Sequence, residues 1–436
     1  MRLSSVAVAS FLLALPCATR AQAPNPIPID SAKRVFAEAH VLCSADAGKL
    51  WGVSLCGPMM FVDAPSRQIV ASESDAKGVL TAKDGVFVGA LPADQNVSNT
   101  AVDWSGVRWT QMLWPIMGDE RMRGTIEMHE LFHRIQDQLD LPKMTEGENA
   151  HLDELNGRYY LQLEWRALAR ALEARSDADR AEAAKDALRF RAERYRIYPK
   201  AASDERALEQ NEGLAEYTGV RLGNPTAELQ TQMALHDLTA HLRDATFVRS
   251  FAYATGPAYG LLLDRYAPGW HAQLKSGEGF EVMLGRALHV AAAASDSLLV
   301  AKRAQSYDGA ALHAAEADRD AKRREQLAAN RRKFIDGPVL TLRFRKMNVQ
   351  FNPSNLQPLG DAGTVYPTIR VTDEWGVFEG TNGALMKPDW KALVVSAPAV
   401  TTGSTVSGDG WTLTLKPGWK VAPDARSGDF TLVAPD

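Results

Sequence analysis

The chain is short of cysteine, of net charge and of long apolar runs. Its 436 residues include three cysteines, so at most one disulfide can form within the chain. The formal net charge of −4 gives no basic surplus of the kind that nucleic-acid-binding proteins carry. Beyond the first residues, no apolar run is long enough to cross a bilayer. We therefore expect two or three domains, no nucleic-acid partner and no transmembrane segment in the mature protein.

The N-terminus has the pattern of a secretory signal. Arg2 precedes an apolar stretch from Val6 to Leu15, and a run dominated by small residues follows at 18–23. We expect cleavage near the end of that run. This assigns residues 1–23 to a signal peptide and predicts a secreted or periplasmic protein.

Cys43 and Cys56 are the two cysteines that remain after this cleavage. Exported proteins mature in an oxidising compartment, where paired cysteines form disulfides, and we predict a disulfide between these two. The alternative is a pair of separate buried thiols, because free cysteine is commonly buried.

Residues 129–133 read His-Glu-Leu-Phe-His. On a helix, His129 and His133 share one face, so both imidazoles can bind one Zn²⁺ ion at about 2.0–2.1 Å. Glu130 would lie beside the metal, where a general base can take a proton from water that the ion activates. Apolar neighbours, among them Leu131 and Phe132, favour a buried helix over a surface helix that carries two histidines by chance.

A catalytic zinc ion takes three protein ligands and leaves a fourth position open, so a third ligand must come from further along the chain. Residues 211–215 read Asn-Glu-Gly-Leu-Ala, which closely resembles the Asn-Glu-Gly-Phe-Ala segment of aminopeptidase N-like gluzincin metallopeptidases. The resemblance implies that Glu212 is the third ligand, with Glu209 and Glu216 next in line. It also implies that Glu216 holds a ligand histidine through a hydrogen bond. Glu205 and Glu209 are interpreted as the solvated side of an amphipathic helix.

The chain departs from the gluzincin pattern in the spacing of its two motifs. Glu212 lies 79 positions after His133 (212 − 133), whereas related enzymes separate them by a few tens of residues or fewer. The pattern over 152–198 predicts an inserted helical hairpin with a polar turn in the middle. At its start, His151 and Glu154 are interpreted as structural or solvent-exposed residues.

A tyrosine near residue 250 completes the resemblance. Residues 253–256 read Tyr-Ala-Thr-Gly and lead into an apolar helix, similar to the gluzincin segment that positions a tyrosine against the transition state. The resemblance implies that the hydroxyl of Tyr253 stabilises the oxyanion. Tyr259 is the alternative, and either tyrosine could be an ordinary core aromatic residue with a satisfied hydroxyl.

One aminopeptidase feature is missing from this sequence. Aminopeptidase N-like enzymes carry a Gly-x-Met-Glu-Asn strand whose glutamate holds the free amino group of the substrate, and no such string precedes His129. Residues 99–114 stand in its place as a β-prone run that could pair with an extended peptide. Asp103 is a candidate replacement for the glutamate. The sequence leaves open whether an endopeptidase or an aminopeptidase is encoded.

The strand and helix patterns predict an α+β fold. A helix over 31–46, several short strands and then mostly helical sequence from about 200 to 334 suit a gluzincin-like metallopeptidase domain over 24–335, with a strand-rich and a helical subdomain. The strands predicted before the histidine motif are Leu50–Leu55, Met59–Asp63, Gln68–Ser72 and Val86–Leu91.

Residues 336–436 change to short alternating segments and predict an all-β, sandwich-like domain. The strands predicted there are Val339–Phe344, Thr364–Val371, Ala392–Ser396, Trp411–Leu415 and Phe430–Val433.

Taken together, these features predict an exported zinc-dependent metallopeptidase that acts on a peptide or protein substrate. Two alternatives stay open. One is an exported, non-catalytic binding protein whose metal site serves folding, although retention of Glu130 disfavours it. The other is a zinc hydrolase of a non-peptide substrate, because the motif specifies activated water and not the bond that is attacked.

Overall fold

The computed structural model describes residues 27–92, 95, 97–116, 119–145, 147–290, 296–351 and 355–435. The predicted signal peptide, residues 1–23, lies outside these residues. The chain divides into two compact units, one ending at Leu139 and the other starting at Asp140. Among the described residues there are 11 α-helices and three sheets, so the prediction of a mixed α+β fold is confirmed at this level. None of the described helices is long and apolar enough to cross a membrane.

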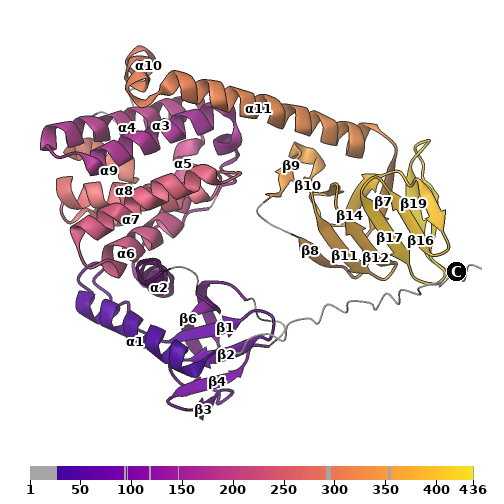
Figure 1. The fold of residues 1–436 in the computed structure, drawn as a ribbon, viewed down its shortest axis with the longest axis horizontal. Coiled ribbons are helices and arrows are strands. Elements are labelled where there is room, and N and C mark those ends of the chain that lie inside the picture. Colours follow the sequence, from indigo (N-terminus) through magenta and orange to yellow (C-terminus); the bar gives the residue numbers. More distant parts are fainter. Residues whose placement is uncertain are drawn as a thin grey trace, which may run out of the picture. The chain divides into compact units, whose positions relative to one another are not determined.

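The first unit is built on a six-stranded sheet in the order β3-β4-β2-β1-β6-β5 (Figure 1). Strands β1 and β6 run parallel, with Phe61 beside Met112, and the other neighbouring pairs are antiparallel. All five residues of the central strand β1 are buried, as expected of an apolar strand with neighbours on both sides. The elements are α1 (Ile29–Asp46), β1 (Met59–Asp63), β2 (Gln68–Ala71), β3 (Thr81–Lys83), β4 (Val86–Ala90), β5 (Thr100–Trp104), β6 (Val107–Trp114) and α2 (Glu120–Ile135).

The strand predicted at Leu50–Leu55 is wrong, because this segment is a turn-rich connection between α1 and β1. Gly48 and Gly52 both have φ near +75°, a left-handed conformation that favours glycine and interrupts an extended strand. The backbone N–H of Gly52 donates to the carbonyl oxygen of Gly48 at 2.8 Å. At the two ends of this connection, Cys43 and Cys56 form a disulfide with their Cα atoms 5.2 Å apart.

The second unit begins with helices. Helices α3 (Leu155–Glu173) and α4 (Asp177–Ile197) pack along one another and occupy the segment predicted for a helical hairpin (Figure 1). The hydroxyl of Ser176 accepts a hydrogen bond from the backbone N–H of Asp179 at 3.1 Å, which caps α4 where the hairpin turns. The remaining helices are α5 (Ala201–Leu208), α6 (Leu214–Gly223), α7 (Ala227–Ala240), α8 (Ser250–Tyr266), α9 (Phe280–Ala287), α10 (Ser297–Ala304) and α11 (Gly309–Arg331).

After α11, the chain forms two sheets, in the orders β18-β19-β7-β14-β13-β10-β9 and β15-β16-β17-β12-β11-β8 (Figure 1). Residues from both sheets share one apolar cluster, among them Leu393 of the first sheet and Phe378 and Leu413 of the second. Strand β17 alternates buried and exposed residues along its length. This arrangement is a β-sandwich.

The strand predicted at Thr364–Val371 is two strands in the structure. β10 (Thr364–Tyr366) belongs to the first sheet and β11 (Ile369–Asp373) to the second, because the chain turns at Pro367. The other strands are β7 (Val339–Arg343), β8 (Asn348–Phe351), β9 (Gln357–Pro358), β12 (Gly376–Gly380), β13 (Ala384–Met386), β14 (Ala392–Ser396), β15 (Val400–Thr402), β16 (Thr405–Gly408), β17 (Trp411–Leu415), β18 (Lys420–Pro423) and β19 (Phe430–Val433).

Candidate metal centre

Helix α2 brings the two histidines of the motif together. The Nε2 atoms of His129 and His133 lie 3.1 Å apart, and their rings meet edge to face. Two zinc–nitrogen bonds of about 2.0–2.1 Å at a tetrahedral angle place their nitrogens roughly 3.3 Å apart, so this spacing fits two ligands of one ion. The neighbouring Leu131 and Phe132 are buried, and α2 packs against α1, β5 and β6. The motif therefore sits on a buried helix, as its apolar flanks predict.

A residue that the sequence analysis missed orients one of these histidines. The Nδ1 atom of His133 lies 3.1 Å from the side-chain oxygen Oε1 of Gln136, one turn along the chain. Because an amide oxygen only accepts hydrogen bonds, Nδ1 must carry the proton, which leaves the Nε2 lone pair for a metal. The three-residue spacing from His133 is the signal that could have revealed Gln136.

Helix α2 carries two buried carboxyl groups near the histidines. Glu130, between the histidines, has 5% of its surface exposed. Glu127 is fully buried, and burial together with the nearby Glu38 raises its pKa to about 8, although Arg123 opposes the shift. At neutral pH Glu127 is therefore mainly a neutral acid, which suits a packing role rather than that of a base.

In the second unit, Glu212 lies on a five-residue π-turn, Glu209–Gly213, between α5 and α6. Its Oε2 atom accepts a hydrogen bond from the hydroxyl of Tyr253 at 2.7 Å, and its Oε1 atom accepts one from Nη2 of Arg249 at 3.0 Å. Burial and the adjacent Glu212 carboxylate raise the pKa of Tyr253 well above its usual range, so the phenol stays protonated and donates. Both carboxylate oxygens are thereby held in fixed directions.

The π-turn packs against α8 backbone to backbone. A Cβ atom placed on Gly256 would lie 2.1 Å from the carbonyl oxygen of Gly213, which is closer than any real side chain comes. Glycine at position 256 is therefore required for this approach. The same helix carries Tyr253 one turn earlier, so the contact sets the distance from its hydroxyl to Glu212. The Tyr-x-x-Gly pattern thus has a packing explanation here.

His129, His133 and Glu212 form a group that could hold a metal ion. Two imidazoles and a carboxylate are a donor set that suits zinc and leaves room for a fourth ligand. The other such group in the described part of the chain is His40, Cys43 and Cys56, whose cysteines are joined in the disulfide and so are not thiolate donors.

Glu205 and Glu209 are not on a solvated face, and that interpretation is wrong. They are 0% and 2% exposed, respectively. Arg194 donates two hydrogen bonds to the carboxylate of Glu205, and Arg191 does the same for Glu209. Burial alone would raise the pKa of Glu205, but Arg194 lowers it below its usual range, whereas burial leaves the pKa of Glu209 raised.

The other tyrosine of the motif belongs to the core. Tyr259 is fully buried, and its hydroxyl donates to Oε1 of Glu164 at 2.7 Å. Glu216 is half-buried on α6, one turn after Glu212. The structure therefore places Tyr253, and not Tyr259, against the predicted ligand.

The remaining predicted residues lie in ordinary polar contacts. Asp103 is an exposed residue on the edge strand β5 and is paired with Arg108 at 2.6 Å. His151 contacts Glu205 through Nε2 at 2.7 Å, and Glu154 accepts a hydrogen bond from the hydroxyl of Tyr198 at 3.2 Å.

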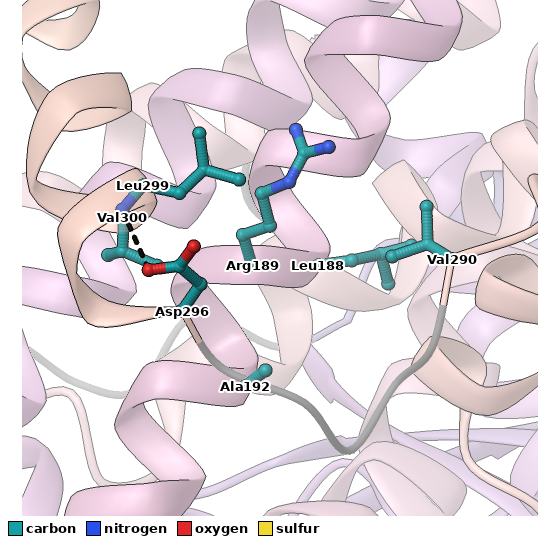
Figure 2. Close-up of a pocket in the computed structure, with 7 residues that line it drawn as sticks. All are labelled: Leu188, Arg189, Ala192, Val290, Asp296, Leu299 and Val300. Atoms are coloured by element: carbon teal, nitrogen blue, oxygen red, sulfur yellow. Dashed lines mark hydrogen bonds between the residues drawn. The ribbon is translucent and has the colours of Figure 1, made fainter.

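Figure 2 shows a pocket between α4 and α10 that contains none of the predicted site residues. Its one carboxylate, Asp296, accepts hydrogen bonds from the backbone N–H groups of Leu298 and Leu299 and so serves as the cap of α10. The lining residues are Leu188, Arg189, Ala192, Val290, Asp296, Leu299 and Val300.

Comparison of this chain with protein-family models, curated proteins and solved structures found no match.

Proposed function

We propose that this protein is an exported, zinc-dependent metallopeptidase in which His129, His133 and Glu212 bind the metal and Glu130 is the general base. The observation that carries the proposal is the convergence of the two Nε2 atoms, 3.1 Å apart, beside a buried glutamate. A site kept only for folding has no use for that glutamate and is normally closed by a fourth protein ligand.

The chain's own residues divide the chemical work. Zinc bound here would lower the pKa of a water molecule toward roughly 7 and polarise the carbonyl under attack. Glu130 accepts the proton of that water and can return it to the amine that leaves. His133 keeps its metal-facing nitrogen unprotonated through Gln136. The burial of α2 limits access of bulk water to the base.

Tyr253 has one hydroxyl proton, and in the structure it is donated to Glu212. This contact supports a role in holding the ligand. The oxyanion role implied by the gluzincin resemblance requires the same donor to turn toward the substrate, because one O–H group makes one strong hydrogen bond at a time. The two roles predict different defects in a Tyr253→Phe variant.

The proposed function is tested with Glu130→Gln, measuring zinc content and the cleavage of a mixed peptide library. Glutamine keeps the shape of the side chain but cannot accept the proton. We expect about one zinc per chain in both proteins and a loss of roughly 10²-fold or more in cleavage rate for the variant.

The matched control is Glu127→Gln, which replaces a buried carboxyl group on the same helix that is already mainly neutral at pH 7. We expect this variant to cleave at close to the wild-type rate. Equal cleavage by zinc-loaded wild type and Glu130→Gln would contradict the proposal. Zinc binding without any peptide cleavage by the wild type would favour a hydrolase of another substrate or a binding protein.

A further inference from the structure

The helical hairpin between the two motifs carries arginines that pair with carboxylates of the segment leading to Glu212. Glu164 on α3 and Arg191 and Arg194 on α4 meet Glu205 and Glu209, and we refer to these five residues as the buried charge cluster. Each of them is at most 2% exposed. Charges removed from water to this degree are retained only when they are paired and hydrogen-bonded in good geometry.

Arg191 joins the hairpin to the π-turn. Its Nε atom donates to Oε1 of Glu164 at 2.7 Å, while Nη2 and Nη1 donate to the two oxygens of Glu209 at 2.6 and 3.0 Å. A two-pronged arginine–carboxylate pair fixes orientation as well as distance. The first residue of the π-turn is thus fastened to α4.

Helix α8 holds the same carboxylate from another direction. The hydroxyl of Thr255 donates to Oε1 of Glu209 at 2.6 Å. The neighbouring Gly256 meets Gly213 at the end of the turn, and Tyr253 of the same helix reaches Glu212. Glu209 and Gly213, the two ends of the five-residue turn, are both anchored, and Glu212 lies between them.

The π-turn gives Glu209 and Glu212 separate partners. On a regular helix, residues three apart lie on nearly the same face, whereas the wider turn separates their directions. Glu209 contacts Arg191 and Thr255, and Glu212 contacts Arg249 and Tyr253. A π-turn is an uncommon conformation that persists where surrounding contacts enforce it, and it is often found at functional sites.

We propose that Arg191, acting through Glu209, is a positioning residue for the metal ligand Glu212, so that the inserted hairpin is part of the support of the zinc site. This inference rests on the proposed function. It explains why the two motifs tolerate a long intervening segment, because that segment supplies the cation that fixes the turn. Without Arg191, the carboxylate of Glu209 would be buried without its main counter-charge, and it would either take up a proton or move toward solvent together with the turn. Either change removes the two-pronged contact that fixes the turn.

The test is the zinc dissociation constant, measured by competition with a chelator, in Glu209→Gln and Thr255→Val. Loss of a residue that supports a metal ligand typically weakens metal binding 10–100-fold, and we expect a change of this size for Glu209→Gln. Thr255→Val keeps the charge of Glu209 and nearly the same shape, and it removes one hydrogen bond. We expect it to weaken zinc binding several-fold.

The control is Glu316→Gln, which alters another buried carboxylate of the second unit. Glu316 accepts hydrogen bonds from Arg158 at 3.0 Å and from Gln162 at 2.6 Å, and it is 6% exposed. A residue that serves only folding should lower the unfolding midpoint and leave the zinc dissociation constant of the folded protein unchanged. We expect this behaviour for Glu316→Gln, with zinc affinity within about twofold of wild type, well below the change expected for a supporting residue.

If both Glu209→Gln and Thr255→Val fold and bind zinc as tightly as wild type, the inference is overturned and the proposed function stands. If the wild type binds no zinc, the proposed function itself fails and the inference falls with it. Should Glu209→Gln not fold, the milder Thr255→Val decides, because it removes no buried charge.

Discussion

The helical part of the second unit and its β-sandwich are stabilised by different interiors. The sandwich encloses an apolar cluster drawn from both sheets, in which Phe378 and Leu413 are completely buried. The helical part encloses the buried charge cluster, in which Arg191 and Arg194 are just as inaccessible. A buried carboxylate of the sandwich, Asp373, serves local turns by accepting backbone N–H groups.

This difference indicates which part of the unit needs side chains held in fixed positions and orientations. Apolar packing is non-directional, and it tolerates small shifts of a side chain. Arginine–carboxylate pairs are directional and lose much of their value when either partner moves. The directional contacts occur on the helices that carry the candidate ligand, and the sandwich, which supplies none of the predicted site residues, is held by packing.

The largest effect that would test this comparison is expected for Arg194→Leu. The substitution leaves the carboxylates of Glu164 and Glu205 buried without the guanidinium that now binds both, and breaking such a pair costs about 3–5 kcal/mol. In the sandwich, Leu413→Ala should cost about 2–5 kcal/mol by leaving a cavity. Hydrogen exchange of peptides from α4 and β17 would measure the loss of local stability in each variant.

The losses of stability in Arg194→Leu and Leu413→Ala should depend differently on pH, because one has an electrostatic cause and the other a packing cause. Burial raises the pKa of Glu205 and Arg194 lowers it, so without Arg194 this carboxylate should take up a proton at a higher pH than in the wild type, and the proton relieves the uncompensated charge. The deficit of Arg194→Leu should therefore shrink as the pH falls, while that of Leu413→Ala stays constant. A pH-independent deficit in both variants would mean that Arg194 contributes mainly by packing.

A smaller effect is expected for Tyr253→Phe. If the hydroxyl holds Glu212, the variant should bind zinc about 10–100-fold more weakly, with little change in the rate of the fully loaded protein. If the hydroxyl stabilises the oxyanion, zinc affinity should be unchanged and the rate should fall by about 10²–10³. The matched control is Tyr307→Phe, which removes a phenol-to-carboxylate bond of 2.9 Å to Asp186 and should change neither quantity.

The smallest effect concerns His271, which stacks on Trp270 in the helical part. Burial, opposed by Asp264 and aided by Arg221, lowers its pKa from an ordinary 6.5 to about 4. Because the unfolded chain takes up the proton more readily, stability should fall as the pH drops from about 6.5 to 4. The full shift corresponds to about 3 kcal/mol, and we expect about 1–2 kcal/mol because the ring is partly exposed to solvent. The difference between wild type and His271→Gln in the unfolding free energy should follow that pH window. A difference that does not vary with pH would contradict the shift.

Much of the fold could be predicted because the spacing of apolar residues and the positions of turn-forming residues agree with the structure. Strand β17 alternates strictly, and its predicted bounds are those observed. The failures have local causes. Glycines at positive φ turn the segment 50–55 away from a strand, and Pro367 divides 364–371 between two sheets. Neither effect changes the apolar pattern on which strand prediction relies.

The candidate site was predictable only for residues that belong to a short sequence motif. The spacing of His129 and His133 predicts their convergence, and the structure has it. The roles of Glu205 and Glu209 were not predictable, because a row of carboxylates on a helix is normally solvated and their partner arginines lie on another helix. Only tertiary packing reveals that these charges are buried.

The contact of Gly256 with Gly213 has a consequence for tracing relatives of this protein. A side chain at position 256 would collide with the turn, whereas one at position 213 would meet its nearest neighbours at 3.3–3.4 Å and could be accommodated by a small adjustment. In related sequences, the glycine of the Asn-Glu-Gly triplet should therefore be replaced more often than the glycine of Tyr-x-x-Gly. Distant sequences that share this architecture are better sought by the tyrosine–glycine pair at 253 and 256 than by the more familiar triplet.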